Sequence, residues 1–276
     1  MKTINCKGNL IDLLTPKVVG LINLTPDSFY DGGKLSSEKE IIQQAKKMLE
    51  EGATFLDLGG YSSRPGAKFV SEADELNRIL PVVKLLIKEF PTVNLSIDTF
   101  RSPIAKKCLE NGACMINDIS AGLLDPNMLE VIANYQVPLV MMHMRGNPET
   151  MMLNTNYKDL TNEVLYFFSE RISKARSLGI NDIIVDPGFG FSKKLDQNFE
   201  LFNDLELFSS LKTPVLVGIS RKSMIQKKIN ASAKESLNGT TALHAIALQK
   251  GVSILRVHDV KEAFETISLL QNLKFH

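Results

Sequence analysis

The sequence lacks several features that mark specialised classes of protein. It has no tryptophan and three cysteines among 276 residues. The cysteines, Cys6, Cys108 and Cys114, do not have the spacing of zinc ligands, and they are too few for a disulfide framework. We therefore expect neither a zinc site nor disulfides, and we expect a reducing, cytoplasmic location.

The chain also lacks an excess of charge and long apolar runs. Its 32 basic and 31 acidic residues give a net charge of +1. The chain therefore lacks the strongly basic character of many nucleic-acid-binding proteins, and we expect no nucleic-acid partner. The first seven residues do not resemble a signal peptide. Since no run approaches the roughly 18 apolar residues of a membrane span, we expect no association with a membrane.

What is present is an alternation of short strands with helices. Eight short runs rich in β-branched residues occur along the chain, and eight strand–helix units close into a (β/α)8 TIM barrel of roughly 250 residues. An open doubly wound sheet is the alternative, although it usually has fewer units. The predicted strands are Val18–Leu24, Thr54–Leu58, Asn94–Thr99, Met115–Ile119, Pro138–His143, Ile183–Asp186, Pro214–Ile219 and Ser253–His258.

Apolar residues between these runs recur at spacings of three and four, as on the buried face of a helix. We expect a single domain over 1–276, in which residues 1–17 form a hairpin from Ile4–Lys7 and Leu10–Leu14 that caps the bottom of the barrel. The clearest helical patterns are Ile41, Ile42, Ala45, Met48 and Leu49; Leu76, Ile79, Leu80, Val83, Leu86, Ile87 and Phe90; and Ala263, Phe264, Ile267 and Leu270.

Two connections are longer than the two to six residues usual in α/β units. Residues 25–37 follow the first predicted barrel strand and residues 59–70 follow the second, and both are rich in glycine, proline, serine and aspartate. Loops after barrel strands lie at the carboxyl end, where active sites of this fold are found. We expect these two loops to fold over a ligand.

Polar residues end nearly every predicted strand, so they should meet at one mouth. A single aspartate or asparagine there could simply bond to loop backbone, but buried charges in number require partners or a ligand. Asp98, Asn117, Asp186 and Lys222 offer acceptors, an amide and a cation, which suits a flat heterocycle with donor and acceptor edges. The strand-end residues are Asn23, Asp57, Gly59, Asp98, Asn117, Asp118, His143, Asp186, Ser220, Arg221, Lys222, Arg256 and His258.

A second group is cationic and comprises Arg64, Arg256 and His258, with Lys222 nearby. The segment 220–223 opens a helix directly after a strand, and the amino terminus of a helix attracts anions. A phosphate or pyrophosphate site is therefore expected, although Arg256 could instead form an internal salt bridge. We interpret His143, in an apolar run, as a buried wall residue rather than a catalyst.

Seven motifs in order make the chain resemble the dihydropteroate synthase family of folate biosynthesis. The resemblance implies that 6-hydroxymethyl-7,8-dihydropterin pyrophosphate and para-aminobenzoate are the substrates, and that 7,8-dihydropteroate and pyrophosphate are the products. It also implies a homodimer built from the late barrel helices. The motifs are Asn23–Gly33, Gly59–Ala67, Ser96–Thr99, Ile116–Ile119, Asp186–Phe191, Ser220–Ser223 and Arg256–Asp259.

The resemblance further implies residue roles. The pterin would be held by Asp98, Asn117, Asp186 and Lys222, and pyrophosphate by Arg64, Arg256 and His258. Asn23 would help to bind Mg²⁺, and para-aminobenzoate would lie near Ser63, Pro65, Phe191, Lys222 and Ser223. Direct parts in catalysis would fall to Arg64, Asp98, Lys222 and Arg256.

Three positions depart from the family pattern: Tyr61 replaces a carboxylate, Ser63 a threonine and Ser192 a glycine.

The sequence also permits three other interpretations of function: a pterin-dependent methyltransferase, a Schiff-base aldolase using Lys222, and a pterin-binding module without activity. The methyltransferase and the binding module would not need the anion site, and the aldolase would leave the pterin-type carboxylates unexplained.

Overall fold

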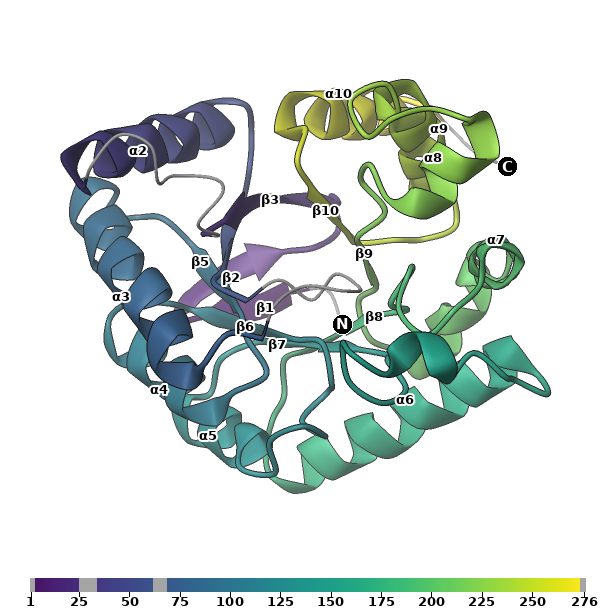
Figure 1. The fold of residues 1–276 in the computed structure, drawn as a ribbon, viewed down its shortest axis with the longest axis horizontal. Helices are drawn as coiled ribbons and strands as arrows, with labels where there is room; N and C mark the ends of the chain where they lie inside the picture. Colours follow the sequence, from purple (N-terminus) through teal and green to yellow (C-terminus); the bar gives the residue numbers. More distant parts are fainter. Residues whose placement is uncertain (1–2, 25–33, 62–68, 274–276) are drawn as a thin grey trace.

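The computed structural model describes residues 3–24, 34–61 and 69–273, with the side chains of 34–37 left aside. Eight parallel strands form one sheet in the order β8-β7-β6-β5-β4-β3-β10-β9. A bridge between Val185 and Val215 joins the two outer strands, so the sheet curls into a barrel (Figure 1). The strands are β3 (Lys17–Asn23), β4 (Phe55–Gly59), β5 (Leu95–Asp98), β6 (Met115–Asp118), β7 (Leu139–Met142), β8 (Ile183–Asp186), β9 (Leu216–Val217) and β10 (Ile254–Val257).

Helices surround this barrel as an outer layer (Figure 1). The predicted (β/α)8 barrel is therefore confirmed, and the open doubly wound sheet is not found. Within the described ranges, no helix is long and apolar enough to cross a membrane. The helices are α2 (Lys34–Glu50), α3 (Glu72–Glu89), α4 (Ser102–Glu110), α5 (Met128–Tyr135), α6 (Leu160–Ser177), α7 (Leu195–Asn203), α8 (Ser223–Ile229), α9 (Leu237–Gln249) and α10 (Val260–Leu270), with short 3-10 turns at Met151–Leu153 and Leu205–Leu211.

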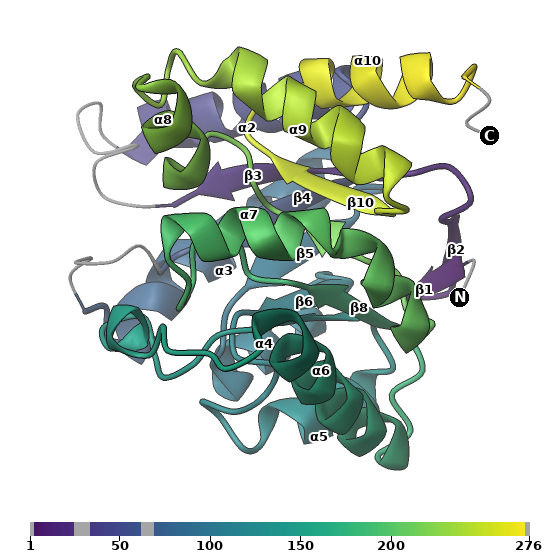
Figure 2. The same cartoon turned by 90° about the vertical axis from the view of Figure 1, so that its right-hand side faces the viewer.

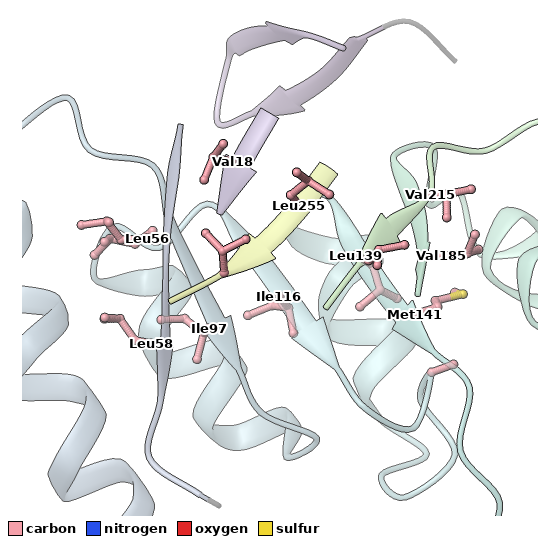
Figure 3. Close-up of a cluster of buried hydrophobic side chains, with 14 of the residues drawn as sticks. Val18, Leu56, Leu58, Ile97, Ile116, Leu139, Met141, Val185, Val215 and Leu255 are labelled. Carbon is pink, nitrogen blue, oxygen red and sulfur yellow. The ribbon is translucent and has the colours of Figure 1, made fainter. Parts of the chain in front are cut away.

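Alternate residues of each strand face opposite sides, which creates two apolar regions. One set, which includes Val18, Leu56 and Ile97, belongs to the large core between strands and helices (Figure 3). The alternate residues of each strand face the barrel axis. At the end where the strands begin, which we call the lower end, these residues form a second cluster that includes Phe55 and Ile184. The strands are hydrophobic on both faces because both faces are covered.

The predicted amino-terminal hairpin is confirmed, with strands β1 (Thr3–Cys6) and β2 (Asn9–Asp12) pairing antiparallel. Lys7 and Gly8 both have positive φ, as a two-residue turn between such strands requires. Ile4, Cys6 and Leu13 pack against the lower inward cluster. The hairpin therefore plugs the end at which the barrel strands begin (Figure 2).

Two expectations about the elements differ from the structure. The predicted strand 214–219 is reduced to Leu216–Val217, because Pro214 has no N–H to donate and residues after 217 turn toward the mouth. In α10 the buried face includes Val260, Ala263 and Ile267, whereas Phe264 is 46% exposed. The Phe264 ring instead lies against Gly52, where a Cβ atom would approach it to 2.5 Å.

Candidate active site

Along each of three strands, the side chains that face the barrel axis change from apolar to polar between one inward-facing residue and the next, two positions later. Phe55 is followed by Asp57, Ile184 by Asp186 and Ile254 by Arg256, each on the same face of its strand. The register of the sheet pairs Asp98 with Asn117, which brings two further polar side chains to this mouth. Strand geometry alone therefore gathers three of the predicted pterin residues, Asp98, Asn117 and Asp186.

Arg256 lies at the centre of the polar layer. Its Nε is 2.7 Å from Asp57 Oδ2, and its Nη2 is 2.6 Å from Asp98 Oδ2. Asn117 Nδ2 also donates to Asp57 Oδ2, at 3.4 Å. The structure thus brings Asp98, Asn117 and Arg256 together as expected, and it shows Arg256 in the internal salt bridge considered as its alternative.

The charges in this cluster shift one another. Burial raises the pKa of Asp98 to about 7, with Arg256 opposing the shift and Asp57 adding to it. Burial acts against the charge of Arg256, but the two carboxylates outweigh it and raise the pKa of the guanidinium above its usual range. Oδ1 of Asp57 is buried and has no hydrogen-bond partner among the described residues. A ligand with N–H groups would satisfy this acceptor.

Lys222 approaches the same layer from the other side of the mouth. Its Nζ donates to the carbonyl of Phe189 at 2.5 Å and lies 4.8 Å from the centre of the Phe191 ring. Burial lowers the pKa of Lys222 to about 8, although Asp186 opposes the shift. The same burial raises the pKa of Asp186, and Lys222 opposes it. The structure therefore brings the predicted residues Asp186, Phe191 and Lys222 together around the Lys222 ammonium.

Residues 188–191 form a strap that follows β8 and carries both contacts of Lys222. Asp186 Oδ1 accepts a hydrogen bond from the Gly188 N–H at 2.8 Å, which turns the chain as it leaves the strand. Gly188 has φ of +71°, and a Cβ atom there would lie 2.1 Å from the carbonyl oxygen of His143. Only glycine allows this close approach of the strap to the end of β7.

The predicted anion side joins the ends of β9 and β10. Ser220 Oγ accepts the backbone N–H of His258 at 3.2 Å, and His258 Nδ1 lies 3.2 Å from the same oxygen. Arg221 forms a two-point ion pair with Asp259, at 2.7 and 2.8 Å. The two basic motifs therefore lie side by side, with Ser223 exposed at the start of α8.

The remaining predicted residues lie partly outside the described part of the chain and partly at the ends of strands. Ser63, Arg64 and Pro65 lie outside the described residues. Asn23, the predicted metal ligand, is half-buried at the end of β3, where it pairs with Gly59. His143 is buried at the end of β7, as interpreted from its apolar run.

The comparison with known proteins decides the family. Residues 19–258 match the family model described as pterin binding enzyme. The dihydropteroate synthase of Escherichia coli (strain K12) is 41% identical over 267 residues, which are 96% of this chain and 94% of that one. This chain belongs to the dihydropteroate synthase family.

Solved structures of dihydropteroate synthases agree with this assignment. The Xanthomonas albilineans dihydropteroate synthase with 4-aminobenzoic acid matches with a TM-score of 0.91 and 36% identity over 99% of each chain. The dihydropteroate synthase from the same organism in complex with 7,8-dihydropteroate matches with a TM-score of 0.88 and 34% identity, over 99% of this chain and all of that one. The likeness extends over the barrel and its mouth.

Three charged residues of the polar layer and its surroundings have no role assigned from the sequence. The sequence predicts Asp57 only as a strand-end residue, although its position two residues after Phe55 indicates that it faces inward. Glu75 occupies an apolar-face position four residues before Ile79, where it accepts a hydrogen bond from Thr99 Oγ1 at 2.7 Å. Lys193 gave no signal, because two adjacent lysines are typical of an exposed surface.

The flanks of the second long loop are tied by one side chain. Arg101 donates to the carbonyl of Val70 at 2.8 Å and lies 5.4 Å from the ring of Tyr61, while it forms an ion pair with the buried Glu75. Tyr61 also makes an edge contact with Phe100. The tyrosine that replaces the family's carboxylate therefore packs on an arginine rather than pairing with it.

Proposed function

We propose that this chain is a dihydropteroate synthase that condenses 6-hydroxymethyl-7,8-dihydropterin pyrophosphate with para-aminobenzoate. The observation that carries the proposal is the polar layer of Asp57, Asp98, Asn117, Asp186 and Lys222 around Arg256. This layer lies at the carboxyl end of a barrel whose sequence is 41% identical to a dihydropteroate synthase.

The carboxylates and the amide suit the edge of a pterin ring. Asp98 and Asp186 can accept hydrogen bonds from ring and amino N–H groups, and Asn117 can donate as well as accept. The free oxygen of Asp57 adds one acceptor in the same layer. Lys222, which is half-buried and attracted by the charge of Asp186, can donate to a ring nitrogen or carbonyl.

The cations suit the leaving group. When the bond from the pterin methylene to the diphosphate oxygen breaks, the electron pair stays on that oxygen and positive charge develops on the methylene. Arg256, His258 and Arg64 would stabilise the oxygen charge, while Asp98 and Asp186 favour the cationic ring. The neutral arylamine then forms the C–N bond and loses a proton to solvent or to the diphosphate, so no strong general base is required.

The acceptor would lie beside the strap. Lys222 and the Phe191 ring are in contact, and Ser223 is exposed where α8 begins. These groups offer a cation, an aromatic face and a hydroxyl to an aromatic carboxylate such as para-aminobenzoate. Ser63 and Pro65 are expected to complete this subsite.

We also propose Mg²⁺ as the cofactor, with Asn23 as its protein ligand. The described residues contain no group of three or more His, Cys, Asp or Glu that could hold a metal. One asparagine oxygen fits a Mg²⁺ ion, which keeps several waters and is held mainly by substrate phosphates. When bound, such an ion would neutralise charge on the diphosphate.

A homodimer in the cytoplasm is the further expectation. Exposed apolar side chains occur on the last three helices, including Ile229, Ile246 and Phe264, and they support an interface there. The three cysteines are free and buried, in keeping with a reducing compartment. Light scattering of the purified chain would measure the mass of the assembly, and a monomer mass would refute the dimer.

Release of pyrophosphate tests the proposed function directly. The purified protein is given the pterin diphosphate and Mg²⁺, with and without para-aminobenzoate, and the pterin product is identified by mass. Release that depends on para-aminobenzoate, with dihydropteroate formed, supports the proposal. Release without it, giving the hydroxymethyl pterin, would leave the acceptor unknown, and pterin binding without release would contradict the reaction.

A further inference from the structure

A charged side chain lies buried under the strap, outside the set that the reaction uses. Lys193 is 2% exposed. Its Nζ lies 3.1 Å from the carbonyl oxygen of Gly188, 3.0 Å from that of Phe191 and 3.0 Å from His143 Nδ1. A lysine so deeply buried is uncommon, so its contacts require an explanation.

The three contacts match the three protons of an ammonium group. Two acceptors are carbonyl oxygens, which can only accept, and the third is a ring nitrogen of His143. Burial lowers the pKa of His143 well below its usual range, and the neighbouring charges of Lys193 and Arg145 lower it further. His143 is therefore neutral and can accept at Nδ1, which places its own proton on Nε2.

These contacts fasten the strap to the end of β7. Gly188 opens the strap and Phe191 closes it, and both carbonyls point to the same ammonium. Asn198 Oδ1 accepts the N–H of Gly190 at 2.6 Å and holds the middle of the strap. Between these fixed points lies Phe189, whose carbonyl accepts from Lys222.

Lys193 also balances charge. Three carboxylates, Asp57, Asp98 and Asp186, lie in the polar layer, but only Arg256 and Lys222 face them as cations among the described residues. No carboxylate of the described residues forms an ion pair with Lys193. Burial lowers the pKa of Lys193 to about 7, and the charge of Asp186 opposes the shift. Lys193 thus gains from Asp186 at a distance and favours its ionised form in return.

We propose that Lys193 is a positioning residue of the pterin site. It holds the strap against His143, so that the Phe189 carbonyl and the Phe191 ring keep the Lys222 ammonium in place. It also supplies the third positive charge opposite the three carboxylates. The proposal deepens the proposed function and rests on it, because Lys222 is taken to contact the substrate.

The test compares two adjacent lysines in the full chain. Lys193→Met removes the charge and all three donors at nearly constant volume, whereas Lys194→Met makes the same change on an exposed neighbour. We expect Lys193→Met to lower kcat/KM for the pterin diphosphate by about 10- to 100-fold, since small misplacements of a positioned group have effects of this size. Lys194→Met should match the parent protein, and equal activity of both variants would overturn the proposal.

A pH profile separates positioning from a general loss of structure. The charged and titratable groups that face Lys193 are His143 and Arg145 after β7, Asp186 on β8 and Lys222 after β9. Lys193 loses its proton near pH 7, before Lys222 does near pH 8, so kcat/KM of the parent protein should begin to decline near pH 7. In Lys193→Met only the decline due to Lys222 should remain, and the alkaline limb of kcat/KM should therefore lie at higher pH. A limb at the parent position, in a variant that has lost activity, would mean that Lys193 has only a structural role.

Variants at His143 keep the test decisive if Lys193→Met does not fold. His143→Asn keeps an acceptor near the place of Nδ1, whereas His143→Leu removes it. We expect His143→Asn to retain more activity than His143→Leu. Equal activity of the two would show that the bond to Lys193 does not position the strap.

Binding of 6-hydroxymethyl-7,8-dihydropterin, measured by calorimetry, distinguishes a failure of this inference from a failure of the proposed function. If the parent protein binds this pterin but releases no pyrophosphate, the proposed reaction is wrong, and the same variants are then compared by pterin affinity. A weaker affinity in Lys193→Met than in Lys194→Met supports the positioning role, and equal affinities refute it.

Discussion

The two ends of the barrel interior are built from the same strands and differ by one step along them. At the lower end, Phe55, Ile184 and Ile254 meet in an apolar layer that the hairpin covers. Two residues later, Asp57, Asp186 and Arg256 occupy the same inward face. The lower layer is stable without a ligand, whereas the upper one keeps an unsatisfied carboxylate oxygen. The comparison separates what folds this protein from what it does.

The largest expected effect comes from the lower end. Phe55→Ala removes a fully buried ring, and we expect the free energy of unfolding to fall by about 3–5 kcal/mol because the cavity cannot fully collapse. Urea unfolding measures this loss. Activity per folded molecule should be unchanged, and Leu14→Ala, at a site 68% exposed, should leave stability within about 0.5 kcal/mol. A tenfold loss of activity in folded Phe55→Ala would show that the two ends are coupled.

At the upper end, Arg256→Ala should act mainly on turnover. The change removes the cation that joins Asp57 to Asp98, and we expect kcat to fall by about 10²- to 10³-fold, as for loss of one group that stabilises a developing charge. Affinity for the free pterin should fall much less. Calorimetry and pyrophosphate release measure the two, with the exposed Arg176→Ala as control. Equal losses in both would place Arg256 in pterin binding alone.

Asp98→Asn sharpens the comparison through pH. Burial raises the pKa of Asp98 from its ordinary 3.8 to about 7, so the folded protein keeps a proton that the unfolded chain loses. The contribution of Asp98 to stability therefore falls as pH rises through this window, while its ability to accept from a pterin rises. We expect Asp98→Asn to weaken pterin binding by about tenfold at pH 8, as for loss of a charged hydrogen bond. The variant should also lose the decrease in pterin affinity that the parent protein shows as the pH falls below about 7. An unchanged affinity by calorimetry would remove Asp98 from the ring edge.

The smallest effect concerns Lys222. Burial lowers its pKa to about 8, so kcat/KM for the pterin diphosphate should decline above that pH as the ammonium loses its proton. Between pH 8 and 10.5 the unfolded chain binds more protons at this lysine than the folded one, so its contribution to stability rises there. Activity should thus fall over a range in which this lysine does not destabilise the fold. A flat profile to pH 9.5 would contradict the role of Lys222.

Much of the barrel follows from local patterns. The strand predicted at Ile183–Asp186 matches the structure, and the others shift by one or two residues, because apolar runs and turn residues specify strands directly. The gathering of Asp98, Asn117, Asp186 and Lys222 was also predictable, since parallel strands end at one mouth.

Pair partners were not predictable in the same way. That Arg256 contacts Asp57 depends on the sheet order that sets β10 beside β3 and β4 beyond it. The burial of Lys193 depends on the path of the strap, which in turn depends on the left-handed backbone of Gly188 and Gly190. Such features arise from tertiary packing rather than from a periodic signal. The sequence alone therefore could not distinguish Lys193, one of two adjacent lysines, from a surface lysine.

The barrel closes at its weakest seam. Among the described residues, one bridge, Val185 to Val215, joins β8 to β9, and β9 itself has two residues. Asp186 and Lys222 lie on opposite sides of this seam, so their attraction holds the two sides together. If the pterin binds between them as proposed, it would strengthen this connection. Amide hydrogens of β9 should therefore exchange with solvent sooner than those of β4 in the free protein, and slow markedly when the pterin is bound.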